Sequence, residues 1–139
     1  IGPDKLNQLR HLYFLKNFDG VKAQMAKHRA LIAPKFQIVE SKLEKELAGK
    51  NVAKWSNPKG GYFISVDVLP GCAKRVVKLC ADAGVKLTAA GATFPYGKDP
   101  DDSNIRVAPT YPSQEELGQA MELFCIAVQL AATEKLIAP

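Results

Sequence analysis

Apolar side chains recur at every third or fourth position through the first third of the chain, which is the spacing of one face of a helix. The spacing predicts a helix from Asp4 to about Asn17, with Asp4 capping its first turn. A longer helical pattern runs over residues 19–48 and ends at Gly49. Pro34 lies inside this pattern and predicts a kink in one long helix rather than two unrelated helices.

The middle of the chain changes to the two-residue alternation of strands, interrupted by turn residues. Alternation is clearest over residues 61–69, where it predicts a strand with one apolar face. Shorter strands are predicted over residues 51–55, 85–88 and 104–108. A loop rich in Gly, Pro and Asp fills residues 89–102, and loops of this length are typically functional or mobile.

Two further helices are predicted in the second half of the chain. An apolar stripe over residues 73–81 indicates an amphipathic helix that Gly84 ends. Ser113 and Glu116 have the spacing of a capping box, in which each side chain reaches the backbone of the other. The apolar positions that follow, to Val128, predict a C-terminal helix.

The order of these elements predicts an α+β fold of two layers. Helices cover one face of a small, mostly antiparallel sheet, and a long kinked helix leads into it from the N-terminal side. The chain has 139 residues, of which 47% are hydrophobic, and this suits one packed domain. No apolar run approaches the roughly 18 residues that span a membrane, so we expect no membrane partner.

The net charge and the first five residues limit the classes of protein to which this chain can belong. The net charge is +5, but the lysines are scattered and form no basic cluster, so we expect no nucleic-acid partner. Residues 1–5 contain neither an initiator Met nor a signal-peptide pattern, so we expect the chain to begin within a longer, cytoplasmic protein.

Thiol and metal chemistry find little support in the sequence. Cys72, Cys80 and Cys125 form no CxxC pair, and their odd number argues against a disulfide framework, so we expect buried, inert thiols. The acidic turn at residues 99–102 lacks the Gly and Glu of a calcium loop, and no zinc-ligand spacing is present. We therefore expect no metal site, and no lysine lies in an obvious nucleophilic setting.

Arg106 is the one residue that points to a specific chemistry. It is the only charged residue in its predicted strand, and burying an arginine is costly unless it is paired. One interpretation is a structural ion pair with Asp67 or Asp102. The other is a clamp for a small carboxylate, because a planar guanidinium matches the two carboxylate oxygens. The residues alone leave both interpretations open.

Four runs occur in order along the chain and together resemble a known family. They are Ile-Gly-Pro-Asp-Lys-Leu-Asn-Gln-Leu-Arg at 1–10, Pro-Lys-Gly-Gly-Tyr-Phe at 58–63, Thr-Ala-Ala-Gly-Ala-Thr-Phe-Pro-Tyr-Gly at 88–97, and Asn-Ile-Arg-Val-Ala-Pro at 104–109. The set resembles the C-terminal small domain of fold-type I, PLP-dependent aminotransferases, and is most similar to the MocR-type aspartate aminotransferases.

The resemblance implies a division of labour between two domains. Residues 1–35 would form an interdomain helical arm and residues 36–139 the small domain, while the large PLP-binding domain is absent from this chain. The Schiff-base lysine is expected upstream of residue 1. The full-length enzyme would transfer an amino group from an amino acid such as aspartate to a 2-oxo acid, and would be a homodimer. The chain alone is expected to be inactive and to bind no PLP.

The resemblance also assigns roles to three residues. Arg106 matches the arginine that binds the α-carboxylate of the substrate, and Tyr62 and Phe94 match positions near the rim of the active site. The alternative function is a stand-alone module without catalysis, which either binds small carboxylates or serves in dimerisation.

Overall fold

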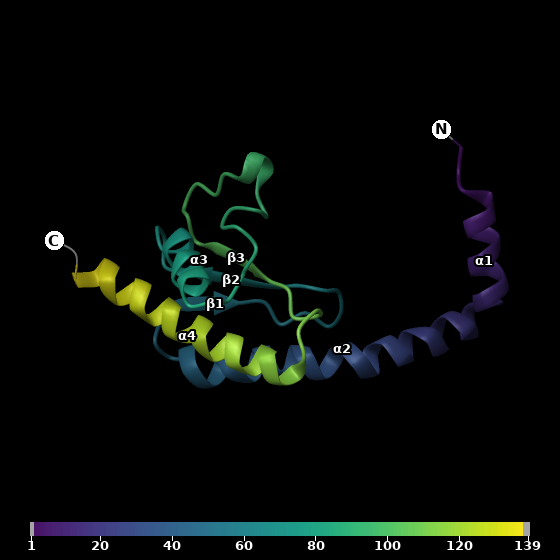
Figure 1. The fold of residues 1–139 in the computed structure, drawn as a ribbon, viewed down its shortest axis with the longest axis horizontal. Helices are drawn as coiled ribbons and strands as arrows, with labels where there is room; N and C mark the ends of the chain where they lie inside the picture. The colour runs from purple at the N-terminus through teal and green to yellow at the C-terminus, as the bar shows by residue number, and fades with distance from the viewer. Residues whose placement is uncertain (1, 138–139) are drawn as a thin grey trace. The chain divides into compact units, whose positions relative to one another are not determined.

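The computed structural model describes residues 2–137 and contains, within them, four α-helices, three strands and one short 3-10 turn (Figure 1). In chain order they are α1 (Lys5–Leu15), α2 (Phe18–Leu47), β1 (Ala53–Trp55), β2 (Ile64–Val68), α3 (Ala73–Asp82), η1 (Pro95–Gly97), β3 (Asn104–Val107) and α4 (Gln114–Ile137). The chain divides into two units, one ending at Pro34 and the other beginning at Lys35. The predicted role of residues 1–35 as an interdomain arm stays a prediction.

The first unit consists of α1 and the first half of α2. The predicted cap is confirmed, because the backbone N–H of Asn7 donates to Oδ1 of Asp4 at 3.0 Å. Between the helices the chain turns so tightly that a Cβ on Gly20 would lie 1.8 Å from the carbonyl oxygen of Leu15. Only glycine fits this close approach. No side chain of α1 is buried.

The second unit contains the sheet. Its strands lie in the order β1-β2-β3 and both pairs are antiparallel, which confirms the predicted fold class. In the register of β2 and β3, Val66 lies opposite Ile105 and Ser65 lies opposite Arg106. Alternate side chains of a strand point to opposite faces, so one face carries the buried aliphatic residues and the other carries Ser65 and Arg106.

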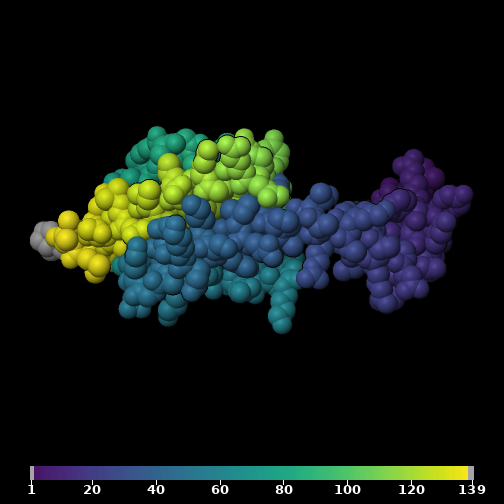
Figure 2. Space-filling model, turned by 90° about the horizontal axis from the view of Figure 1, so that it is seen from below, coloured from purple at the N-terminus to yellow at the C-terminus, as the bar shows by residue number. Residues whose placement is uncertain are grey.

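Three helical segments pack over the aliphatic face. They are α3, α4 and the part of α2 that begins at Phe36, where its buried positions start. Figure 2 shows α4, in yellow, lying along this part of α2, in blue. The contact is polar at its edge, where Nζ of Lys42 lies 3.4 Å from Oε1 of Glu122, and apolar inside, where Phe124 is fully buried.

The predicted capping box at the start of α4 is confirmed. The N–H of Ser113 donates to Oε2 of Glu116 at 2.8 Å, and the N–H of Glu116 donates to Oγ of Ser113 at 3.2 Å. Nζ of Lys35 donates to the carbonyl oxygens of Thr110 and Pro112 at 2.8 and 2.6 Å. The part of the loop that leads into α4 is therefore fixed by both sets of bonds.

One predicted strand is wrong. Residues 85–88 pair with no strand among the residues that the structure describes. The N–H of Val85 instead donates to the carbonyl of Cys80 at 2.8 Å, and Gly84 has a φ of +89°, so this segment closes the end of α3. The strand predicted over 61–69 is confirmed but shorter, and α2 continues through Pro34 as one helix. None of the helices within residues 2–137 is long and apolar enough to cross a membrane.

Candidate functional site

The face of the sheet opposite the helices carries polar side chains from two strands. We call this surface the polar face and define it by Ser65 and Asp67 of β2 and Asn104 and Arg106 of β3. The register pairs Ser65 with Arg106 and Asp67 with Asn104, so the four residues form one block. It lies on a hydrogen-bonded sheet, which is a rigid support for a binding group.

Arg106 is the cation of the polar face, and its side chain is half-buried. Its Nε atom is buried and has no hydrogen-bond partner among residues 2–137. Neither acid considered from the sequence pairs with it. Asp67 accepts a hydrogen bond from Nδ2 of Asn104 at 2.6 Å, and Oδ1 of Asp102 lies 3.9 Å from Nζ of Lys74. Within the described chain, the guanidinium has no anionic partner.

The guanidinium of Arg106 contacts the aromatic ring of Phe63. The Cζ atom of Arg106 lies 4.4 Å from the centroid of this ring, which is the geometry of a cation–π contact. The residue predicted from the sequence to lie near the site was the neighbouring Tyr62. Alternation indicates that Phe63 and Ser65 share a face, because they are two positions apart, but only the register places Ser65 opposite Arg106.

Asn104 ties a loop to the polar face. Its Nδ2 donates to Oγ of Ser65 at 2.8 Å as well as to Asp67, and its Oδ1 accepts a hydrogen bond from Oγ1 of Thr93 at 2.7 Å. Asn104 is buried, and these bonds satisfy a side chain that would otherwise be costly to bury. Thr93 belongs to the loop over residues 89–102, so the loop is anchored two positions from Arg106.

The two other predicted site residues lie near these contacts along the chain. Tyr62 precedes Phe63 and is largely exposed, and Phe94 follows Thr93 and begins the turn η1. The structure thus brings Arg106 together with Phe63, and it places Tyr62 and Phe94 beside residues that contact the polar face. The rim role of Tyr62 and Phe94 stays a prediction.

In the acidic turn after η1, the side chain of Asp99 binds backbone N–H groups. The carboxylate of Asp99 accepts hydrogen bonds from the N–H groups of Asn104, Ser103 and Asp101 at 2.8, 2.8 and 3.1 Å. These donors, with Asn104 the strongest, hold the pKa of the Asp99 carboxyl below its ordinary value. Asp99 therefore stays ionised and shapes the entry into β3. No cluster of three or more potential metal ligands occurs within residues 2–137.

The predicted burial of the three thiols is confirmed. Cys72, Cys80 and Cys125 are all free and buried. Burial raises the pKa of Cys80 to about 11 and that of Cys125 to about 12, and it raises the pKa of Cys72 as well. Thiolates are the nucleophilic form, so none of these groups is poised for nucleophilic catalysis near neutral pH.

We expect the thiols to resist alkylation until the chain unfolds. Native protein treated with iodoacetamide at pH 8 gains no adduct by mass spectrometry, whereas protein in guanidinium gains one adduct at each cysteine. Raising the pH beyond 9 lowers the free energy of unfolding, because the unfolded chain releases its thiol protons first. Rapid labelling of the native protein would contradict the burial.

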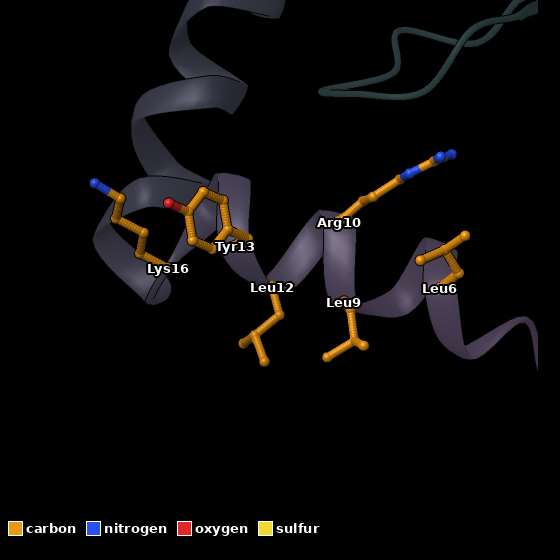
Figure 3. Close-up of a pocket in the computed structure, with 6 residues that line it drawn as sticks. All are labelled: Leu6, Leu9, Arg10, Leu12, Tyr13 and Lys16. Atoms are coloured by element: carbon orange, nitrogen blue, oxygen red, sulfur yellow. The ribbon is translucent and has the colours of Figure 1, made fainter.

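A second surface lies on α1 and is apolar. Figure 3 shows Leu9 and Leu12 pointing to the same side of the helix, away from Arg10, in a shallow depression that Leu6, Tyr13 and Lys16 also line. Leu9 and Leu12 are more than half exposed. Most of the side chains that line this surface are apolar, although Arg10 and Lys16 also line it, so it suits contact with protein rather than chemistry.

Comparison with known proteins relates the chain to one family of sequences. Residues 1–139 match the family model described as Aspartate amino-transferase. A Mycolicibacterium smegmatis protein provisionally named an aminotransferase is 55% identical over 137 residues, which are 99% of this chain and 32% of that protein. The chain spans about a third of the length of the relatives it matches.

Solved structures share the fold. An aspartate transaminase from Corynebacterium glutamicum superposes with a TM-score of 0.93 at 48% identity, over 97% of this chain and 32% of that one. An alpha-aminoadipate aminotransferase from Thermus thermophilus, complexed with N-(5'-phosphopyridoxyl)-L-leucine, superposes with a TM-score of 0.73 at 19% identity, over 92% of this chain and 32% of that one. At that identity the second likeness is one of fold only.

Proposed function

The chain belongs to the aspartate aminotransferase family, and we propose that it is the C-terminal small domain of a MocR-type, PLP-dependent aspartate aminotransferase. The full-length enzyme would transfer an amino group from an amino acid such as aspartate to a 2-oxo acid. The observation that carries this proposal is the guanidinium of Arg106, which has no anionic partner among residues 2–137 and stands on the polar face of the sheet.

In this proposal Arg106 binds the α-carboxylate that amino-acid and 2-oxo-acid substrates share. Its terminal nitrogens are the natural donors, because they carry parallel N–H bonds that match the two carboxylate oxygens. Only Nε of this side chain is both buried and unpartnered, so the terminal nitrogens reach solvent and a ligand. Fixing the carboxylate orients the bonds at Cα, and orientation of this kind lowers the barrier to reaction.

The site for PLP is part of this proposal, and we propose that it lies in the large domain. No lysine within residues 2–137 is buried, and a Schiff-base lysine needs a desolvated setting or a cationic neighbour to lower its pKa. PLP, when bound, supplies the electron sink for the reaction. We therefore assign the cofactor and its lysine to the large domain of the longer protein, and we assign only substrate binding to this chain.

The remaining parts of the proposal follow from the same family. Tyr62 and Phe94 would line the rim of the active site, and the loop over residues 89–102 would approach the substrate when the domains close. The full-length enzyme would be a homodimer. We place it in the cytoplasm, because three free, buried thiols suit a reducing compartment.

An assay of the chain by itself tests whether catalysis needs the large domain. We expect residues 1–139 to give no transamination of aspartate with 2-oxoglutarate and no new absorbance band on addition of PLP, whereas the full-length enzyme gives both. The reason is that, in this proposal, the chain supplies the carboxylate clamp and the large domain supplies the cofactor lysine. Turnover by the chain alone would overturn the proposal.

The alternative function is a stand-alone carboxylate-binding module, and the unpaired Arg106 also favours it. Calorimetry with succinate separates the two. The aminotransferase proposal predicts weak or no heat from the chain alone, because half of the site lies elsewhere. Tight binding of succinate that disappears in the Arg106→Lys variant would favour the alternative.

A further inference from the structure

We infer that Phe63 is a positioning residue for Arg106, and that its ring holds the guanidinium in the pose that receives a substrate carboxylate. The inference rests on the proposed function and adds a residue to it. Its direct observation is the distance of 4.4 Å between Cζ of Arg106 and the centroid of the Phe63 ring.

The position of the ring follows from local sequence and from register. Gly61 has a φ of +96°, a conformation that favours glycine, and it turns the chain into β2. Phe63 comes immediately before β2 and is two positions from Ser65, which lies opposite Arg106. Diagonal neighbours of this kind on two antiparallel strands are within reach of aromatic and long side chains.

The ring of Phe63 is the contact that restrains the guanidinium on the polar face. On the polar face, Oδ1 of Asp67 and Oγ of Ser65 accept hydrogen bonds from Asn104, and none from Arg106 is present within the described chain. Rotamer freedom of an arginine is large, and losing it on binding weakens a ligand. Stacking on Phe63 restricts the side chain before the ligand arrives.

An aromatic ring also suits this task better than an acid. A cation–π contact uses the flat face of the guanidinium, whereas the N–H bonds lie in its plane. The ring therefore fixes the group and leaves its in-plane donors and its full charge available. A carboxylate in the same place would neutralise the charge and occupy the donors that the substrate needs.

The first test uses the chain itself and needs no activity. In nitrogen-15 spectra, the Nε–H signal of Arg106 is identified by its loss in the Arg106→Lys variant. We expect it to be shifted upfield by the ring current, to move to the ordinary arginine position in Phe63→Leu, and to stay shifted in Phe63→Tyr. Tyr111→Leu, which removes an almost fully exposed ring, serves as the control and leaves the signal in place. A signal that Phe63→Leu does not move would overturn the inference.

The second test uses the full-length enzyme. Phe63→Leu keeps an apolar side chain of similar reach but removes the ring, and we expect kcat/KM for aspartate to fall about tenfold, mainly through KM. Phe63→Tyr restores most of the loss, which a simple packing defect would not explain. If Arg106→Lys is strongly impaired but Phe63→Leu and Phe63→Tyr behave alike, the positioning role fails and the proposed function stands. If Arg106→Lys is unimpaired, the proposed function itself fails.

Discussion

Replacing Arg106 by lysine lowers kcat/KM of the full-length enzyme for aspartate by about 100-fold, which corresponds to about 2.7 kcal/mol of lost transition-state stabilisation. Lysine keeps the charge but replaces a planar pair of donors by a single point charge, so the two-point grip on the carboxylate is lost. Steady-state kinetics with aspartate and with 2-oxoglutarate measure the effect. We expect both substrates to be affected, because both carry the α-carboxylate that we propose Arg106 to bind.

Arg75 offers a matched control for this substitution. It lies on the outer surface of α3, where its Nε and Nη2 donate to the carboxylate of Glu134 at 2.7 Å. This pair lies on the surface and contacts no residue of the polar face, so we expect Arg75→Lys to leave kcat/KM unchanged. Equal kinetics for the wild type and the Arg106→Lys variant would contradict the assignment of Arg106.

Truncating Phe124 to alanine lowers the free energy of unfolding of the chain by about 3–5 kcal/mol. Phe124 is fully buried in α4, where the helical layer meets the sheet, and the cavity left by its ring cannot be refilled by neighbours that are themselves close-packed. Urea unfolding followed by circular dichroism measures the change. A loss of this size is a large part of the total stability of a domain.

The control for the core lies two positions further along the same helix. Ile126 is 61% exposed, so Ile126→Ala removes side-chain atoms from α4 without opening a cavity. We expect a change below about 1 kcal/mol for this variant. If both variants shifted the urea midpoint equally, the loss in Phe124→Ala would reflect helix propensity and not the packing described for the core.

Elements with strong local signals were predicted well from the sequence. Asp4 and the pair Ser113 and Glu116 carry their capping chemistry within four residues, so the starts of α1 and α4 could be located. The alternation around Val66 gave both the existence of β2 and its buried face. For the two helix starts, the contacts that decide the structure come from neighbours in sequence, and for β2 the alternation itself records which side chains are buried.

The prediction of a strand at residues 85–88 failed because it rested on local composition alone. Val-Lys-Leu-Thr has the composition of a strand, but a strand also needs a partner, and partners are set by tertiary structure. Here the first N–H of the run is already used to close α3 at the carbonyl of Cys80. Local composition could not reveal this competition.

The candidate site was predicted in part. Arg106 could be found because a lone arginine in a strand demands an explanation, but its neighbour Phe63 could not be chosen over Tyr62 without the register of β2 and β3. The bond from Thr93 to Asn104 joins residues eleven positions apart across an irregular loop, and no periodic pattern encodes such a contact. The assignment to the MocR type stays a proposal.

The helices differ in how many buried residues they contribute, and this difference affects folding during synthesis. The final helix along the described chain, α4, contributes eight buried side chains, whereas α1 contributes none. During synthesis, the aliphatic side of the sheet therefore emerges from the ribosome well before the helix that shields it. Exposed strands of this kind are prone to wrong association. The growing polypeptide thus passes through a stage in which the aliphatic face of the sheet lacks the cover that α4 provides.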